Sequence, residues 1–322
     1  MTFPLVSILI VSYNHEKWVS KAIESVLSQT YQNIEVIVID DYSKDRSVDV
    51  IRNFEGDPRV KVIYKSKNMG QSNSINQAVR LSKGKYLAWL ASDDWYYPDK
   101  IQRQVALFET LSEKYGVVYG RTDRYYESDG RLQVGSNALH RGDVMAHLVT
   151  DWGFISPMSP MFRREVLVEY PMIERFIAEG ESIFFKIAQK YYFDYVEDSV
   201  GVMRDHDYNT GSKFVIMYKE TLDWWNSFLA QHDTHTFYRA NKRRILGKLY
   251  RMYGLSILTE TDRPKLARQL LIGAVRTDLR NLFDYKVLGG IMLSLLDLSL
   301  CRWIILQKRK KIVRVSGTHL ES

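Results

Sequence analysis

The first 120 residues alternate between short β-rich runs and segments with helical periodicity, and this alternation most constrains the fold. The runs Leu5–Val11 and Ile34–Asp40 are almost entirely apolar, which is typical of parallel strands covered on both faces. In the intervening segment His15–Gln29, the apolar residues fall on one helical face. Three more β-rich runs follow: Val60–Tyr64, Tyr86–Leu90 and Val117–Tyr119. The order predicts an α/β fold with a doubly wound, mostly parallel sheet.

Helical segments continue along the rest of the chain. Periodicity predicts a helix through Ser74–Ser82, and Pro98 suits the first turn of a helix that runs to about Lys114. The middle of the chain has a mixed pattern, and its last third is mostly helical. We therefore expect an α/β domain over residues 1–213 and a basic, mostly helical region over residues 214–322.

Polar side chains follow three of the predicted parallel strands. The first strand ends in Ser12-Tyr13-Asn14, the second in Asp40-Asp41 and the fourth in Ser92-Asp93-Asp94. In open α/β sheets, ligands bind beyond the carboxyl ends of the strands. Acidic side chains crowded at one edge repel each other unless a cation or hydrogen-bond donors lie between them. The sequence therefore predicts a ligand site at this edge.

The adjacent carboxylates of Asp93 and Asp94 are hard oxygen ligands that suit Mg²⁺ or Mn²⁺. A divalent ion held there would keep positions open for nucleotide phosphates and stabilise a departing diphosphate. Asp41 offers a carboxylate that can accept hydrogen bonds from a base imide or a ribose hydroxyl. The alternative is helix capping, by the Asp93-Asp94 pair before Pro98 and by Asp41 or Asp45 before another helix.

Five segments follow one another in the first 115 residues: Val6–Asn14, Asp40–Asp45 (D-D-x-S-x-D), Asn68–Gly70 (N-x-G), Gly84–Tyr86 (G-x-Y) and Ser92–Asp94 (S-D-D). In this order they resemble glycosyltransferase family 2. The resemblance implies a GT-A fold, a nucleotide-sugar donor and inversion at the anomeric carbon.

The resemblance also implies a nucleotide site and a metal site on particular residues. Asp93 takes the metal position of the family's D-x-D motif, with Asp94 beside it and Mn²⁺ or Mg²⁺ as the ion. The usual first acid of that motif is Ala91 here, which leaves one ligand fewer. An Arg that often precedes Asn76 is replaced by Ile75, which removes a phosphate contact. The implied nucleotide-binding residues are Ser12, Tyr13, Asn14, Glu16, Asp41, Asn68, Asn76 and Asp93.

An inverting transfer needs a general base that takes the proton from the attacking hydroxyl. In the family this base is usually the Asp of an E-D pair that opens a helix. The matching stretch here is Glu179-Gly180-Glu181-Ser182, with Gly180 at the usual Asp position. Either Glu181 supplies the base from a shifted register, which we favour, or Glu179 does. The alternative is that both acids simply favour a helix N-terminus electrostatically.

The segment Arg204–Asn209 resembles the R-x-H-x-x-N segment of the family. His206 is therefore expected to complete the metal shell or to contact the diphosphate; the alternative is an ordinary loop histidine. Trp95, beside Asp94, and Trp152 are expected to line the acceptor or sugar pocket, because sugars stack their C–H faces on aromatic rings.

Basic residues concentrate toward the C-terminus. Residues 239–314 contain 18 basic and 5 acidic residues, whereas the whole chain has 45 and 38, so the rest of the chain is net acidic. Val287–Leu306 is long enough to span a bilayer, but Asp297 and Arg302 interrupt it. We expect an interfacial helix on an anionic membrane surface, followed by the basic run Lys308–Lys311. The alternative is a packed helical region with a basic tail. Nucleic acid is not expected as a partner, because no binding motif accompanies the charge.

The single cysteine, Cys301, cannot form an intrachain disulfide, and the first residues lack the basic start and cleavage site of a signal peptide. We expect a cytoplasmic protein, peripheral on the inner face of the plasma membrane. The resemblance predicts an inverting glycosyltransferase that moves a sugar from a UDP-sugar to a hydroxyl of a glycan or lipid-linked saccharide, in bacterial surface polysaccharide synthesis. The alternatives are a catalytically impaired nucleotide- or glycan-binding module, because of Gly180 and Ala91, and a basic membrane-interaction protein.

Overall fold

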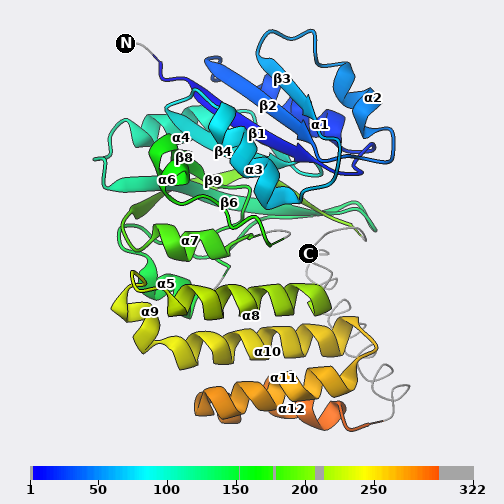
Figure 1. Cartoon of the computed structure of the whole chain (residues 1–322), viewed down its shortest axis with the longest axis vertical. Helices are drawn as coiled ribbons and strands as arrows, with labels where there is room; N and C mark the ends of the chain where they lie inside the picture. Colours follow the sequence, from blue (N-terminus) through cyan, green and yellow to red (C-terminus); the bar gives the residue numbers. More distant parts are fainter. Residues whose placement is uncertain (1–2, 152, 177–178, 207–213, 297–322) are drawn as a thin grey trace, which may run out of the picture. The chain divides into compact units, whose positions relative to one another are not determined.

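The computed structural model describes residues 3–151, 153–176, 179–206 and 214–296 (Figure 1). The chain divides into two compact units, Met1–Tyr208 and Asn209–Ser322. The first unit is α/β, and the described elements of the second are helices. The predicted α/β class with a helical C-terminal region is therefore confirmed. The predicted boundary at residue 213 falls outside the described residues and stays a prediction.

The sheet of the first unit begins with four parallel strands in the order β3-β2-β1-β4. Their bounds are β1 Val6–Ser12, β2 Ile34–Asp40, β3 Val60–Tyr64 and β4 Tyr86–Ala91. In register, Ser12 pairs with Asp40 and Val11 pairs with Ala91. The carboxyl ends of β1, β2 and β4 are therefore level, so the polar segments that follow them lie at one edge, as predicted.

Beyond β4 the sheet becomes mixed, in the order β4-β8-β6-β9-β5. The strand β9 runs parallel to β6, whereas β8 and β5 pair antiparallel with their neighbours. Trp95 in β5 pairs with Val202 in β9. Arg204, near the end of β9, and His206, which follows it, therefore lie beside the loop that follows β4. The bounds are β5 Trp95–Tyr96, β6 Tyr115–Tyr126, β7 Arg131–Gln133, β8 Met161–Arg163 and β9 Tyr192–Asp205.

The helices of the first unit cover a core built from β1, β2 and β4 with the apolar faces of α1 and α4. The helix α1 starts at Val19 rather than His15, because His15–Trp18 forms a turn closed by the carbonyl of His15. The helix α4 ends at Phe108, short of the predicted Lys114. The bounds are α1 Val19–Leu27, α2 Ser47–Arg52, α3 Gln71–Leu81, α4 Lys100–Phe108, α5 Met145–Thr150, α6 Arg164–Glu169 and α7 Ser182–Ile187.

The second unit packs α8, α10, α11 and α12 in successive layers (Figure 1). Its buried aromatic residues include Trp224, Trp225 and Tyr238. None of the helices within the described residues is both long and apolar enough to cross a bilayer. The segment Val287–Leu306 continues past residue 296, beyond which its structure is not described. The bounds are α8 Phe214–Ala230, α9 Thr236–Ala240, α10 Lys242–Glu260, α11 Pro264–Thr277, η2 Leu279–Phe283 and α12 Tyr285–Leu293.

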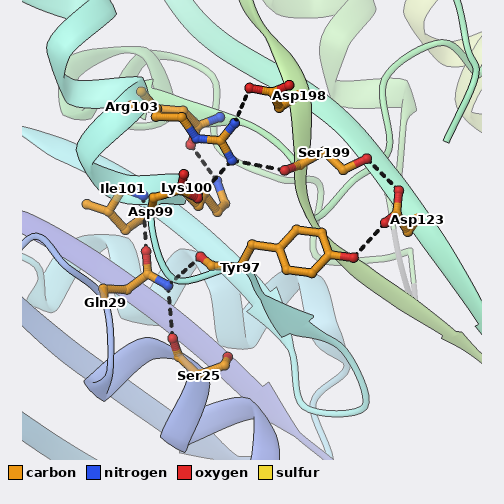
Figure 2. A network of polar contacts seen from close by, with 11 residues as sticks. Ser25, Gln29, Tyr97, Asp99, Lys100, Ile101, Arg103, Asp123, Asp198 and Ser199 are labelled. Atoms are coloured by element: carbon orange, nitrogen blue, oxygen red, sulfur yellow. Dashed lines mark hydrogen bonds and ion pairs between the residues drawn. The ribbon is translucent and has the colours of Figure 1, made fainter. Parts of the chain in front are cut away.

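A buried polar network fixes the segment that follows Asp94 (Figure 2). Gln29 is fully buried, and its amide donates to the carbonyl of Tyr97 (2.8 Å) and accepts from the N–H of Ile101 (3.1 Å). The hydroxyl of Tyr97 donates to Asp123 (2.6 Å). Gln29 therefore joins the end of α1 to the start of α4 across the β5 segment.

We expect Gln29→Ala to lower the free energy of unfolding by about 2–4 kcal/mol, because the N–H of Ile101 and the carbonyl of Tyr97 would lose a buried partner. Urea unfolding measures this change. The control is Gln133→Ala, because Gln133 is exposed on β7, and it should change the free energy by less than about 0.5 kcal/mol. Equal effects of the two substitutions would contradict the role of the network.

Candidate active site

The two acids after β4 are both buried, and their environments separate their protonation. Burial raises the pKa of Asp94 well above its ordinary value, and the charge of Asp93 adds to the rise. Burial also raises the pKa of Asp93. The hydrogen bond with His206 and the charge of the nearby His15 outweigh this effect and bring the pKa of Asp93 below its ordinary value. Of the two carboxyl groups, Asp93 is therefore the one whose surroundings favour the ionised form.

Asp94 is bonded to the strand β9. Its Oδ1 accepts a hydrogen bond from the backbone N–H of Arg204 (2.9 Å). The guanidinium of Arg204 donates to the carbonyl of Asp93 (3.0 Å) and pairs with Glu127. The predicted metal ligation by Asp94 stays a prediction. The sequence places Arg204 at the start of the R-x-H-x-x-N segment but predicts no role for its side chain.

His15, Asp93 and His206 form the candidate metal site. One ligand atom from each of the three lies within 4.8 Å of the others. His206 Nε2 is 3.1 Å from Asp93 Oδ2, and His15 Nδ1 is 3.9 Å from Asp93 Oδ1. Neighbouring ligands of a six-coordinate ion with bonds near 2.1 Å lie about 3 Å apart, and opposite ones lie about 4 Å apart. The residues therefore fit a divalent cation.

The indole ring of Trp18 contacts both imidazoles of this cluster. Trp18 stacks on His206 with ring centroids 3.9 Å apart, and it meets His15 edge-on at 5.3 Å. Burial lowers the pKa of His15, which favours the neutral imidazole that binds metals. Sequence reasoning missed His15, because only the pairing of β1 with β4 brings its turn beside Asp93.

The turn after β1 and the loop after β2 hold each other by hydrogen bonds. Asn14 has a φ of 56° and its side chain accepts from the N–H of Lys44 (2.7 Å). The carboxylate of Glu16 accepts from the N–H of Arg46 (2.8 Å), and the N–H of Glu16 donates to Asp45 (3.0 Å). Asn14 and Glu16, both predicted to line the nucleoside pocket, thus brace this loop.

Ser12 and Tyr13 precede that turn. The hydroxyl of Ser12 is buried, and among the described residues it has no hydrogen-bond partner. The side chain of Tyr13 is 43% exposed at the same edge. Both residues therefore lie where the sequence predicts the nucleotide, and their contacts with it stay predictions.

Asp41 and Asn68 meet at the N-x-G turn. The two carboxylate oxygens of Asp41 accept from the N–H groups of Met69 (3.0 Å) and Gly70 (2.8 Å). Lys65 Nζ is 3.1 Å from Asp41 Oδ1, and both side chains are buried. Asn68 Oδ1 also accepts from the N–H of Gly70 (3.1 Å). Asp41 is thus a structural anchor of the turn, and its predicted contact with the base would share these oxygens.

Asn76 is bonded to the segment that follows α6 and not to the turns after β1 and β2. Its amide donates to the carbonyl of Met172 (2.8 Å) and to Glu174 (3.0 Å), and its oxygen accepts from the N–H of Met172 (2.9 Å). The whole amide therefore ties α3 to the segment after α6. The predicted contact of Asn76 with the nucleotide stays a prediction.

The two candidate bases have different surroundings. Glu179 is buried; its Oε1 is 2.9 Å from Lys186 Nζ, and its Oε2 accepts from the N–H of Ile173 (2.9 Å). Glu181 is half-buried at the start of α7 and lines a small hollow with residues that include Phe184. Gly180 between them has a φ of 56°, a left-handed conformation that favours glycine.

Of the two predicted sugar-pocket tryptophans, Trp95 lies within the described residues. Trp95 is half-buried, with Lys21 Nζ 3.4 Å and the Arg204 guanidinium 4.9 Å from its ring centroid. Its ring already takes part in cation–π contacts. Trp152 lies outside the described residues.

A sheet that is parallel in one half and mixed in the other, with a carboxylate–imidazole cluster at its carboxyl edge, defines a domain of the GT-A class. The family model described as "Glycosyl transferase family 2" matches residues 7–170, more than half of the chain. The chain belongs to glycosyltransferase family 2. The family resemblance predicted from the sequence is therefore confirmed.

Curated relatives match the N-terminal part of the chain. An uncharacterized glycosyltransferase of Rickettsia bellii is 41% identical over 119 residues, which are 37% of this chain and 17% of the relative. The glucosyltransferase WfaP of Escherichia coli, named as UDP-Glc:alpha-D-GlcNAc-diphosphoundecaprenol beta-1,3-glucosyltransferase, is 39% identical over 125 residues, 39% of this chain and 48% of WfaP. The chain thus matches less than half the length of either relative.

Solved structures extend the likeness in fold to most of the chain. TarS 1-349 of S. aureus in complex with UDP-GlcNAc has a TM-score of 0.56 at 15% identity, covering 86% of this chain and 88% of TarS 1-349. The mannosyltransferase PcManGT of Pyrobaculum calidifontis, in complex with GDP-Man and Mn²⁺, has a TM-score of 0.59 at 14% identity, covering 95% and 85%. These likenesses confirm the predicted GT-A fold.

We expect Asp41→Asn to lower the free energy of unfolding by about 1–3 kcal/mol, because Lys65 would lose its buried counter-charge and one N–H of the turn would lose its acceptor. Urea unfolding measures this change. Asp49→Asn is the matched control, since the ion pair of Asp49 with Arg52 is exposed and should contribute less than about 1 kcal/mol. Unchanged stability of Asp41→Asn would show that the anchor is unimportant.

Proposed function

We propose that this chain is an inverting glycosyltransferase that moves a sugar from a UDP-sugar to a hydroxyl of a glycan or lipid-linked saccharide. The observation that carries the proposal is the cluster of His15, Asp93 and His206 at the carboxyl edge of a family 2 domain. The E. coli relative, whose name gives a UDP-Glc donor and a diphosphoundecaprenol-linked acceptor, supports this choice of substrates. Such an acceptor suits bacterial surface polysaccharide synthesis.

Asp93 and His206 would hold a divalent cation, Mn²⁺ or Mg²⁺, in the donor site. When bound, such an ion neutralises charge on the diphosphate of the donor. Arg204 keeps Asp93 in place through its bond to the carbonyl of that residue (3.0 Å). We place the nucleoside at the ends of β1, β2 and β3. The residues proposed to bind it lie at the end of β1 or in the segments that follow these strands: Ser12, Tyr13, Asn14, Glu16, Asp41 and Asn68.

The chemical step is a single displacement. The acceptor hydroxyl attacks the anomeric carbon and forms the new C–O bond, while its proton passes to the carboxylate of Glu181. The bond from the anomeric carbon to the diphosphate breaks, and its electron pair leaves on the phosphate oxygen. Attack from the face opposite the leaving group inverts the anomeric configuration.

We favour Glu181 as the base, because it lines a hollow at the start of α7, whereas Glu179 is buried. Glu179 is paired with Lys186 and bonded to the N–H of Ile173, whereas Glu181 lines a hollow. We place the acceptor sugar beside Glu181, with Trp95 and Trp152 as candidate stacking partners.

We expect Glu181→Gln to lower the turnover number by about 10²–10⁴-fold and to leave UDP binding unchanged, because only proton transfer is lost. Transfer from UDP-glucose to a GlcNAc-diphospho-lipid, followed as UDP release, measures turnover, and calorimetry with Mn²⁺ measures UDP binding. Glu179→Gln should instead lower stability, since Lys186 would lose its buried partner. Equal turnover of Glu181→Gln and the unchanged chain would contradict the role of Glu181 as the base.

We also propose that the second unit docks on an anionic membrane surface, on the inner face of the plasma membrane. Phe283 and Tyr285 are 88% and 78% exposed. Soluble surfaces rarely expose such a dense apolar segment. Arg276, Arg280 and Lys286 lie on the same stretch and would face anionic headgroups. The exposed apolar residues of η2 and α12, with the two leucines that follow, are Leu279, Leu282, Phe283, Tyr285, Leu288, Met292, Leu295 and Leu296.

We expect the double substitution Phe283→Glu and Tyr285→Glu to weaken binding to phosphatidylglycerol-containing vesicles by at least about tenfold, because both rings would lose apolar burial. Cosedimentation measures the binding. Val168→Glu is the control, since Val168 is an exposed apolar residue of α6 in the first unit. A double variant that binds these vesicles as well as the control would contradict the proposal.

A further inference from the structure

One ligand position of the metal site is lost in the sequence. Where the D-x-D motif has its first acid, this chain has Ala91, whose methyl group cannot bind a cation. Asp93 and His206 alone would give a divalent ion two protein ligands. The structure brings a third group, His15, to the same place, from a segment with no part in that motif.

The backbone of His15 is fixed by neighbouring elements. Its N–H donates to the hydroxyl of Ser47 (2.9 Å), at the start of α2. The pairing of Val11 with Ala91 places the turn after β1 directly beside the loop after β4. His15 is therefore held by the same strands that position Asp93.

The ring of His15 is also fixed and points toward Asp93. Its Nδ1 lies 2.8 Å from Ser92 Oγ and 3.9 Å from Asp93 Oδ1. Trp18 contacts the ring edge-on at a centroid distance of 5.3 Å. A ring that is already oriented by its neighbours loses little freedom when it binds a ligand.

We propose that His15 is a protein ligand of the divalent cation, in place of the acid lost at Ala91, and that the resulting two imidazoles and one carboxylate select Mn²⁺ over Mg²⁺. This inference rests on the proposed donor site. It narrows the choice between the two ions that the sequence leaves open.

Ligand chemistry gives the direction of this selectivity. Mg²⁺ prefers oxygen ligands in a strict octahedral arrangement, whereas imidazole suits first-row transition metals. The choice of histidine instead of an acid also changes the charge. With a single carboxylate, a bound divalent ion keeps a net charge near +1, which would attract the diphosphate of a donor.

The test measures Mn²⁺ binding to the full chain by electron paramagnetic resonance, with nitrogen couplings from pulsed spectra. We expect nitrogen couplings from two imidazoles in the unchanged chain and one in His15→Ala, with Mn²⁺ affinity falling at least about tenfold. Mg²⁺ should displace Mn²⁺ only in large excess, and this preference should shrink in His15→Ala. His232→Ala is the control, because His232 is exposed in the second unit.

Ser92→Ala separates ligation from positioning. If His15 binds the ion, this variant keeps both nitrogen couplings, because the ring remains. The inference is overturned if His15→Ala keeps the affinity and both couplings, or if the unchanged chain binds no Mn²⁺. Circular dichroism confirms that each variant is folded.

UDP titration keeps this inference distinct from the proposed function. UDP binding that needs Mn²⁺ but is unchanged in His15→Ala would overturn the role of His15 and leave the donor site standing. Mn²⁺ binding through His15 without affinity for UDP, GDP, CDP or dTDP would support the metal site and remove the transferase proposal.

Discussion

Two adjacent carboxylates, Asp93 and Asp94, are buried at the end of β4, and the first unit depends on compensating them. A buried carboxylate without donors or counter-charge costs several kcal/mol. The return of β9 supplies the partners, since Arg204 donates its N–H to Asp94 and His206 bonds with Asp93. These partners lie 110 and 113 residues further along the chain. The site therefore exists only when the whole sheet has formed.

The sequence predicts the first half of this sheet closely and the second half poorly. The strands β1, β2 and β4 are buried on both faces, so their continuous apolar runs mark their ends to within one residue. The strand β6 extends to Tyr126, whereas only Val117–Tyr119 is apolar enough to be predicted. Beyond Tyr119, pairing with β9 defines the strand instead of burial, and pairing between distant segments leaves little trace in local sequence.

The candidate site divides in the same way. Asp93 and His206 lie in recognisable sequence motifs, and in the structure Asp93 Oδ2 is 3.1 Å from His206 Nε2. His15 has no local signal, because its place in the cluster comes from the pairing of β1 with β4. Asn76 differs from both, because the sequence predicts a nucleotide contact for it and the structure shows its amide bonded to the backbone of Met172. Residue type and order thus predict chemistry, whereas hydrogen-bond partners decide which side chains remain available.

Several residues at this edge serve the scaffold and the site together. Asn14 and Glu16 hold the loop after β2, and Asp41 holds the turn at Met69 and Gly70. Each bond joins two segments that follow different strands, so the edge is ordered before any ligand arrives. When the loops of a site are already ordered in the folded chain, ligand binding does not lose free energy in ordering them. More of the binding free energy is then available to stabilise charge at the reacting centre. This explains why polar side chains crowd an edge where a purely structural sheet would gain nothing from them.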